Sequence, residues 1–367
     1  MNSTPSTSTP ATAAPTPTST TTPTAAAPGG AVPAGFSATS YTAISADYYW
    51  LLGSAPCDGT TCTSIIRTTD GGAHFVSVPA PPAPLAFTSL SSTTGQIDSL
   101  RFADPLDGYA FGASPSESNA GIWVTHDGGE RWTSVPMGQV LAFDVSDGEA
   151  FAVVGNCTPG GCSDVRLERS VATTDNWLKT PLPSAQGSYL VSISAQQDQV
   201  WINADSGNSS GEQLLHSADR GATFSTGRSP CDAGLGGTVQ ATSDDVLWFT
   251  CPTGMMAQAV RSSDGGATFE SLDTGPVPNS ARVAPADSTT AVLVNASSSA
   301  IELTTDAGAS FHQVFDPPGT TGWIYAGFTT PEDCVAIATL QTVGTPYPST
   351  ALWRTTDRGI TWQQVSY

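Results

Sequence analysis

The sequence predicts an all-β, seven-bladed β-propeller that follows a disordered N-terminal stalk. One eight-residue pattern recurs seven times, the segments between its copies alternate apolar and polar residues, and no window keeps a helical periodicity. The aspartates of successive copies are 57, 48, 44, 45, 42 and 51 residues apart, a period typical of propeller blades. These aspartates are Asp70, Asp127, Asp175, Asp219, Asp264, Asp306 and Asp357.

Six of the seven copies have a Ser or Thr, an Asp two positions on, a Gly two after that, and an aromatic residue three further on, as in Ser262–Phe269. This arrangement predicts a tight turn in which the Asp carboxylate accepts backbone N–H groups and the Gly adopts a positive φ. The aromatic residue is expected to start the next strand and to pack between neighbouring sheets. The copy around Asp175 has Asn176 and Trp177 and no Gly, so we expect a differently shaped turn there.

The pattern resembles the Asp-box, or BNR repeat, of sialidase-type propellers, written Ser/Thr-x-Asp-x-Gly-x-Thr/Ser-Trp/Phe. The resemblance implies that each box is the turn between the third and fourth strands of a blade, on the face away from the ligand, and that its aspartate is structural. Residues 99–112 (SLRFADPLDGYAFG) and 122–132 (IWVTHDGGERW) resemble a blade of the Ycf48-type photosystem II assembly factors. The arginine-rich surface associated with that role is missing, because the eleven arginines are scattered among the blades. This second resemblance therefore implies the fold alone.

Composition divides the chain into two parts. Residues 1–35 are rich in Thr, Ser, Pro and Ala and contain no charged side chain, so they cannot bury enough apolar surface to fold. We expect them to form a disordered linker or stalk. Residues 36–367 provide about 47 residues for each repeat, which is enough for four short strands, and we expect one closed domain.

The net charge of −20 restricts the partners. With 32 acidic residues against 12 basic ones, the chain has no basic stripe that would neutralise phosphates, and we expect no nucleic acid as a partner. No apolar run has the length of a membrane span, so no transmembrane segment is expected. We expect a monomer.

The cysteines point to an oxidising compartment. Cys57 and Cys62 have the same C-x4-C spacing as Cys157 and Cys162, and both loops fall between the second and third strands of their blades. We expect a disulfide in each, because zinc needs four converging ligands and these loops are two blades apart. Cys231 and Cys251 flank a predicted strand pair and are expected to pair, which leaves Cys334 without an assigned role. The protein is expected to be extracellular or at the cell surface, with an export signal or lipid anchor upstream.

No catalytic residues can be assigned. Sialidases use three arginines, a Tyr nucleophile activated by a Glu, and an Asp acid, and the Arg-Ile-Pro motif of the first arginine is absent here. Arg67, Arg261 and Arg354 each precede a box directly, so they are interpreted as neighbours of the boxes. The four histidines lie in or beside boxes of four different blades and cannot converge, so neither a metal nor a cofactor is expected. A calcium ion at the acidic turn Asp244–Asp245 is an open alternative.

Two functions from different classes remain. The first is a non-enzymatic exported propeller that binds or scaffolds a protein or glycan partner on the face opposite the boxes, and the alternative is a glycan-active hydrolase with an unrecognised site. Loops that a rigid scaffold positions are where binding residues concentrate. On that face we expect the aromatic residues Trp323, Tyr325 and Tyr347 to be candidate binding residues. The sequence leaves open whether Trp323 and Tyr325 belong to the core between blades instead.

Overall fold

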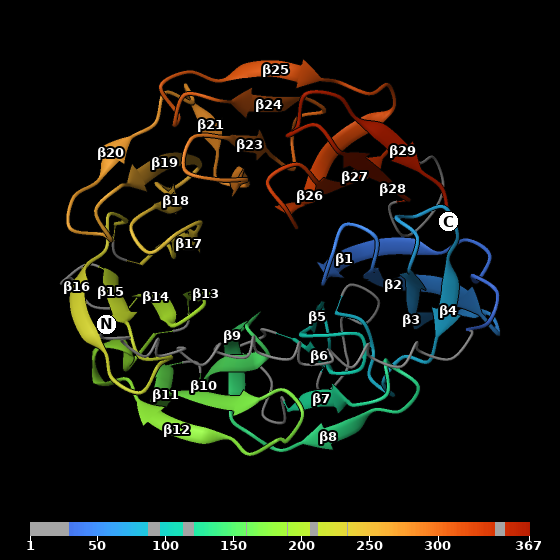
Figure 1. Cartoon of the computed structure of the whole chain (residues 1–367), viewed down its shortest axis with the longest axis horizontal. Coiled ribbons are helices and arrows are strands. Elements are labelled where there is room, and N and C mark those ends of the chain that lie inside the picture. Colours follow the sequence, from blue (N-terminus) through green and yellow to red (C-terminus); the bar gives the residue numbers. More distant parts are fainter. Residues whose placement is uncertain are drawn as a thin grey trace, which may run out of the picture.

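The computed structural model describes residues 29–86, 96–112, 121–158, 160–188, 190–205, 212–232, 234–341 and 349–367. Its strands form seven antiparallel sheets that are arranged as a ring, so the chain is a seven-bladed β-propeller, as the sequence predicts (Figure 1). In each sheet the strands pair in chain order, from a first strand near the axis of the ring to a fourth strand at its circumference.

The first four blades lie within the N-terminal two thirds of the chain. Blade 1 comprises β1 (Ser37–Ala43), β2 (Tyr49–Cys57), β3 (Thr60–Thr68) and β4 (Val76–Val78). Blade 2 comprises β5 (Ser99–Phe102), β6 (Gly108–Phe111), β7 (Ile122–Thr125) and β8 (Thr133–Val135). Blade 3 comprises β9 (Gln139–Ser146), β10 (Glu149–Thr158), β11 (Gly161–Val171) and β12 (Leu178–Pro181). Blade 4 comprises β13 (Val191–Gln196), β14 (Gln199–Asp205), β15 (Glu212–Ser217) and β16 (Ser225–Arg228).

The last three blades complete the ring. Blade 5 comprises β17 (Thr238–Ala241), β18 (Leu247–Pro252), β19 (Met256–Ser262) and β20 (Glu270–Ser271), and β21 (Val277–Pro278) also pairs with β19. Blade 6 comprises β22 (Arg282–Pro285), β23 (Ala291–Val294), β24 (Ile301–Thr304) and β25 (His312–Phe315). Blade 7 comprises β26 (Thr320–Phe328), β27 (Cys334–Leu340), β28 (Thr350–Thr355) and β29 (Gln363–Val365). A 3-10 turn, η1 (Pro183–Ala185), precedes blade 4.

The core is a ring of interfaces between neighbouring blades. Seven apolar clusters are present, and each combines buried residues from two adjacent blades. Between blades 1 and 2, for example, the ring planes of Trp50 and Phe102 stack with centroids 3.7 Å apart. Both side chains are almost fully buried, and burying an aromatic side chain contributes about 1.5–3 kcal/mol. Each blade therefore depends on two neighbours for its burial.

The repeated turns have one hydrogen-bond arrangement in six blades. In the Ser262–Phe269 copy, the Asp264 carboxylate accepts the N–H of Thr268 at 2.8 Å and the Ser262 hydroxyl at 2.8 Å. The Ser262 hydroxyl oxygen in turn accepts the N–H of Gly266, which has a φ of +93°. Phe269 then packs edge-on against Phe249, with ring centroids 5.5 Å apart. The carboxylate and the hydroxyl thus satisfy donors that no strand ladder reaches.

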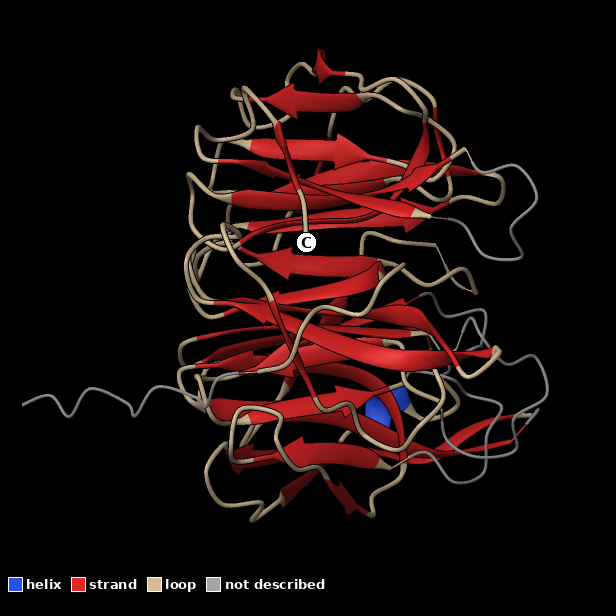
Figure 2. Cartoon of the chain, turned by 90° about the vertical axis from the view of Figure 1, so that its right-hand side faces the viewer, coloured by secondary structure: helices blue, strands red, loops and turns tan. Residues whose placement is uncertain are grey.

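A backbone hydrogen bond ties each of these six turns to the turn between the first and second strands of the same blade. In blade 5, the Gly265 N–H donates to the Asp245 carbonyl at 2.9 Å. The corresponding donors in blades 1, 2, 4, 6 and 7 are the N–H groups of Gly71, Gly128, Arg220, Ala307 and Arg358. Both kinds of turn therefore lie on one face, which we call the aspartate-turn face, and the strand ends at the right in Figure 2 form the opposite face.

The third copy departs from this arrangement, in agreement with the expected change of shape. Asp175 has a φ of +48°, and its Oδ2 lies 3.0 Å from Nε2 of His126 in blade 2. Nδ1 of the same imidazole lies 2.5 Å from Oδ1 of Asp107. Burial lowers the pKa of His126, but its hydrogen bonds with Asp107 and Asp175 outweigh that effect and the pKa is raised. Asp175 thus helps to join blades 2 and 3.

The ring closes between blades 7 and 1 without exchange of a strand, because the strands of each sheet are consecutive in the chain. An apolar cluster from both blades lies at this closure, and the Arg354 guanidinium donates to the Gly71 carbonyl at 2.7 Å and to Asp333 at 2.8 Å. Gly30 forms an isolated antiparallel pair with Ser77 of β4, with two backbone hydrogen bonds of 2.9 Å. Most of the predicted stalk, residues 1–35, lies outside the described residues.

The hydroxyl at the start of each turn is expected to stabilise the fold. Thr304→Val keeps the shape of the side chain but leaves the buried N–H of Gly308 without its acceptor, which lies 3.0 Å away. The expected loss in the free energy of unfolding is about 1–3 kcal/mol, measured by urea denaturation. Thr274→Val is the matched control, because its hydroxyl bonds only the Gly275 carbonyl at the surface, and it should change stability by less than about 0.5 kcal/mol. Equal effects of both variants would contradict the proposed role of the turn.

The turns also make the free energy of unfolding depend on pH in the acidic range. Hydrogen bonds from the side chain and N–H of the residue four positions on lower the pKa of Asp70, Asp219, Asp264 and Asp306 to about 2. In the unfolded chain an Asp titrates near pKa ~3.9, so the native state binds fewer protons between these values. Stability from the turns should be complete above about pH 4 and should fall as the pH decreases toward 2. Carboxyl chemical shifts from NMR check this, and an apparent pKa of about 4 for Asp264 would refute it.

Candidate functional site

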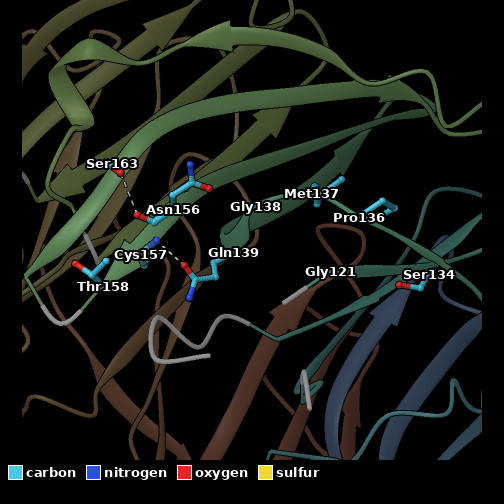
Figure 3. Close-up of a pocket in the computed structure, with 11 residues that line it drawn as sticks. Gly121, Ser134, Pro136, Met137, Gly138, Gln139, Asn156, Cys157, Thr158 and Ser163 are labelled. Atoms are coloured by element: carbon cyan, nitrogen blue, oxygen red, sulfur yellow. Dashed lines mark hydrogen bonds between the residues drawn. The ribbon is translucent and has the colours of Figure 1, made fainter. Parts of the chain in front are cut away.

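A cavity of about 470 Å³ opens between blades 2 and 3 on the opposite face, and we call it the blade 2–3 pocket (Figure 3). It lies where the connection from β8 to β9 faces the end of the β10–β11 hairpin. Its lining comprises Gly121, Ser134, Pro136, Met137, Gly138, Gln139, Gly155, Asn156, Cys157, Thr158 and Ser163. The sequence placed a binding site on this face but did not single out these residues.

The β10–β11 hairpin is braced where it forms one wall of the pocket. Cys157 and Cys162 are directly opposite each other in the ladder and form a disulfide, as expected from their spacing. The Cys157 N–H donates to Oε1 of Gln139 at 2.5 Å, which ties the hairpin to the start of β9. The Ser163 hydroxyl donates to the Asn156 carbonyl at 3.3 Å. A short disulfide loop and these cross-links hold the wall in one conformation.

Two glycines allow the backbones to approach each other at the base of the pocket. A Cβ atom on Gly138 would lie 2.8 Å from the Gly155 carbonyl oxygen, which is closer than real Cβ contacts. The ladder register also shifts between Val154 and Asn156, so a bulge redirects the chain there. Glycine at these positions leaves backbone polar groups accessible where other residues would place side chains.

The lining of the blade 2–3 pocket is polar and uncharged. Asn156 and Ser134 are exposed, and Met137 and Pro136 add an apolar surface. The Asn156 carboxamide can both donate and accept hydrogen bonds. None of the lining residues is an Asp, Glu, His, Lys or Arg. The described lining of the pocket can therefore bind hydroxyl or amide groups, and it contains no side chain that serves as a general acid or base.

A second cavity, of about 280 Å³, lies between the first strands of blades 1, 2, 3 and 7, toward their C-terminal ends, and thus nearer the aspartate-turn face. We call it the axial cavity, and its lining includes Tyr41, Arg101, Asp144, Tyr325 and Phe328. Burial raises the pKa of Tyr325 to about 12, which keeps its hydroxyl protonated at neutral pH.

Asp144 is the carboxylate of the axial cavity. Burial raises its pKa, and the nearby Arg101 guanidinium opposes that rise. Its two oxygens accept the N–H groups of Val145 at 3.0 Å and of Ala195 at 2.8 Å. Because Ala195 belongs to the first strand of blade 4, this carboxylate joins two blades. These two hydrogen bonds fix the orientation of the carboxylate in the cavity wall.

Two of the three aromatic residues that the sequence proposed for binding lie within the described residues. Trp323 has 2% of its surface exposed, packs in the core between blades 6 and 7, and donates its Nε1–H to the Ser299 carbonyl at 3.0 Å. Trp323 is thus a core residue between blades 6 and 7. Tyr325 is half-buried and lines the axial cavity. Tyr347 lies outside the described residues.

The arginines next to the boxes are placed apart from one another. Arg67 lies over the Tyr48 ring and Arg261 over the Trp248 ring, with centroid distances of 5.9 and 5.5 Å, while Arg354 joins blades 7 and 1. They belong to three different blades and form no clamp for a substrate carboxylate. Among the described residues, no group of three or more His, Cys, Asp or Glu is arranged to hold a metal ion.

The remaining cysteines bear on the compartment. Disulfides join Cys57 to Cys62 and Cys231 to Cys251, so all three expected pairs are formed. Cys334 is buried as a free thiol, and burial raises its pKa well above the usual range, which makes it unreactive. Three disulfides indicate an extracellular or otherwise oxidising environment. The described part of the chain contains no helix with the length and apolar composition of a membrane span.

Comparison with known proteins gives one similar sequence and many similar folds. No family model matches the chain. A xyloglucanase of Hypocrea jecorina is 27% identical over 329 residues, which cover 80% of this chain and 35% of the enzyme, so the chain spans about a third of the length of that relative. The structure of YCF48 from Cyanidioschyzon merolae superposes with a TM-score of 0.55 at 12% identity, covering 89% of this chain and 97% of that one.

Two further propellers come from peptidases. The β-propeller domain of the trilobed protease from Pyrococcus furiosus, described as having an open velcro topology, matches with a TM-score of 0.56 at 7% identity over 90% of this chain and 98% of that one. A puromycin-hydrolysing peptidase of Mycobacterium tuberculosis matches with a TM-score of 0.56 at 13% identity over 93% of this chain and 56% of that one. At these identities the structural matches establish the fold alone. The chain is thus a seven-bladed β-propeller with the fold of YCF48 and of peptidase propeller domains, and with sequence similarity to part of a xyloglucanase.

Proposed function

We propose that this propeller is a non-enzymatic, exported or cell-surface binding module, and that the blade 2–3 pocket holds a segment of a neutral glycan chain. The observation that carries the proposal is the uncharged, hydrogen-bonding lining of that pocket. Sugar hydroxyls both donate and accept hydrogen bonds, as the Asn156 carboxamide and the Ser134 hydroxyl do. The apolar surface of Met137 and Pro136 suits the C–H face of a sugar ring.

The same lining argues against hydrolysis at this site. Glycoside hydrolases use two carboxyl groups that flank the scissile bond, at about 5–10 Å from each other. Among its described lining residues the blade 2–3 pocket has none, and the Asp144 carboxylate of the axial cavity accepts two backbone N–H groups. Binding without cleavage is therefore favoured over the alternative, a glycan-active hydrolase.

Sequence similarity and charge narrow the ligand. The similarity to part of a xyloglucanase favours a neutral polysaccharide of the xyloglucan type. The match covers 35% of that enzyme. We therefore propose that this chain binds the polymer, and we do not propose that it cleaves it. A net charge of −20 disfavours polyanionic glycans, since they would approach a surface of their own sign. Three disulfides suit a protein that meets such polymers outside the cell, and the propeller would act as a monomer.

A variant in the pocket tests the proposal. Asn156→Ala removes an exposed carboxamide that bonds no described side chain, so the fold should keep its melting temperature (Tm) while the Kd for soluble xyloglucan oligosaccharides rises about 2–10-fold. Calorimetric titration measures the Kd. The control is Asn295→Ala, in the corresponding loop of blade 6; its Oδ1 accepts the Ser297 N–H at 2.9 Å, and the variant should bind like the unmodified protein.

Three outcomes would contradict this function. Equal weakening by both variants, or no measurable binding of xyloglucan by the unmodified protein, would remove the blade 2–3 pocket as a xyloglucan site. Release of reducing ends from xyloglucan by the purified protein, abolished by a single carboxylate variant, would establish the hydrolase instead.

A further inference from the structure

The axial cavity combines side chains from four blades. Tyr41 belongs to β1 of blade 1, Arg101 to β5 of blade 2, and Asp144 to β9 of blade 3. Tyr325 and Phe328 belong to β26 of blade 7. These are the first strands of their blades, which lie nearest the axis of the ring (Figure 1). The cavity is therefore complete only when blades 7 and 1 have closed the ring.

The Arg101 guanidinium is available to a ligand. Its Nη1 donates to the Leu100 carbonyl at 2.9 Å, and within the described ranges this side chain makes no other hydrogen bond and no ion pair. Arg101 is partly exposed in the wall of the cavity. Most N–H donors of the guanidinium can therefore bind a carboxylate, whose two oxygens match the planar fork of an arginine.

The Tyr325 hydroxyl is a second donor near this guanidinium. The charges of Arg101 and Asp144 both act on the pKa of Tyr325, so the three groups lie within electrostatic reach of one another. No described residue forms a hydrogen bond with this hydroxyl. A Cβ atom on Gly327 would lie 2.4 Å from the hydroxyl oxygen, so glycine at that position makes room for it. The Tyr325 ring packs against that of Tyr41, with centroids 5.6 Å apart, which holds the hydroxyl in place.

Asp144 is the acceptor of the axial cavity, and it forms no ion pair with Arg101 although both side chains are in the same lining. The N–H groups of Val145 and Ala195 bind one carboxylate oxygen each, which leaves each oxygen a further lone pair. The described lining thus carries one positive and one negative charge at separate positions. A simple anion would be attracted by one charge and repelled by the other, and so would a simple cation, whereas a zwitterion can satisfy both.

The size of the axial cavity restricts the ligand to a small molecule. Its volume of about 280 Å³ is just below the range of about 300–1,000 Å³ that is usual for pockets that hold drug-sized ligands. The side chains of Ile44, Val145 and Phe328 add an apolar surface to the lining. A free α-amino acid is a small zwitterion that carries a carboxylate, an ammonium group and a side chain around one carbon atom.

We propose that the axial cavity binds a free α-amino acid with an apolar side chain. The carboxylate of the ligand accepts hydrogen bonds from the Arg101 guanidinium and the Tyr325 hydroxyl, and its ammonium group donates to the Asp144 carboxylate. The side chain of the ligand packs against Phe328. Backbone N–H groups orient Asp144, and ring packing orients Tyr325, so little side-chain freedom is lost on binding.

Calorimetric titration of the full chain with L-leucine tests the site, and the expected Kd is below about 1 mM. Isocaproate lacks the ammonium group of leucine and isoamylamine lacks its carboxylate, so each should bind at least about 10-fold more weakly. Arg101→Gln should raise the Kd for L-leucine about 10–100-fold, because it removes hydrogen bonds to a charged group. The matched control is Arg282→Gln, at the exposed start of the first strand of blade 6 and outside the cavity lining, and it should leave the Kd unchanged.

A titration with L-leucine that shows no binding would overturn the proposal. Equal affinity for L-leucine and for either analogue would also overturn it, since the site would then recognise a single charge, and so would equal Kd values for the two arginine variants. Should Arg101→Gln fail to fold, Tyr325→Phe decides, because it removes only a hydroxyl that bonds no described residue. It should raise the Kd about 2–10-fold, and an unchanged Kd would refute the assignment. None of these results depends on glycan binding in the blade 2–3 pocket.

Discussion

The structure depends on burial between blades, because a four-stranded sheet with both faces apolar cannot be stable alone. Each blade covers one face of the next, and the seven apolar clusters distribute this burial around the ring. The interface between blades 7 and 1 has the same form as the other six, although no chain connection supports it. There the guanidinium of Arg354 and the hydroxyl pair of Ser37 and Thr350, 3.1 Å apart, supply polar contacts beside the apolar cluster.

The aspartate turns provide hydrogen-bond acceptors for backbone N–H groups at the ends of the strands. Strand ends at the circumference leave backbone donors without ladder partners, and the repeated carboxylate and hydroxyl accept them at each of six blades. Where the glycine is missing, in the third copy, the carboxylate of Asp175 contacts His126 of the neighbouring blade instead. In this copy a contact between blades 2 and 3 thus replaces the hydrogen bonds within the turn.

The sequence predicts the fold well because its signal is periodic: the spacing of the aspartates determines the number of blades, and the two C-x4-C loops predict hairpin disulfides. It predicts the candidate site less well, because the site depends on contacts between distant segments. The approach of Gly138 to Gly155 and the bulge before Asn156 are not visible in the local pattern. The ambiguity of Trp323 has the same origin, since an aromatic residue on a first strand can face either the axis or the next blade. The contacts of Glu212 with Asn203 and Gly237 depend on the strand register and on the Cys231 disulfide, so the local sequence does not reveal them.

The absence of strand exchange at the closure has a kinetic consequence. Six interfaces join blades that are consecutive in sequence, so they can form while the chain is still growing or collapsing locally. The seventh brings together residues such as Ser37 and Thr350, which are 313 positions apart, and Tyr41 and Thr329, which are 288 apart. Closing so long a loop has a large entropic cost while the chain is flexible. Once the other blades have stacked, their arc holds blades 1 and 7 close to each other, and this cost becomes smaller. Ring closure is therefore expected as the last step of folding, and an incomplete ring would expose the apolar faces of exactly two blades to solvent and to other chains.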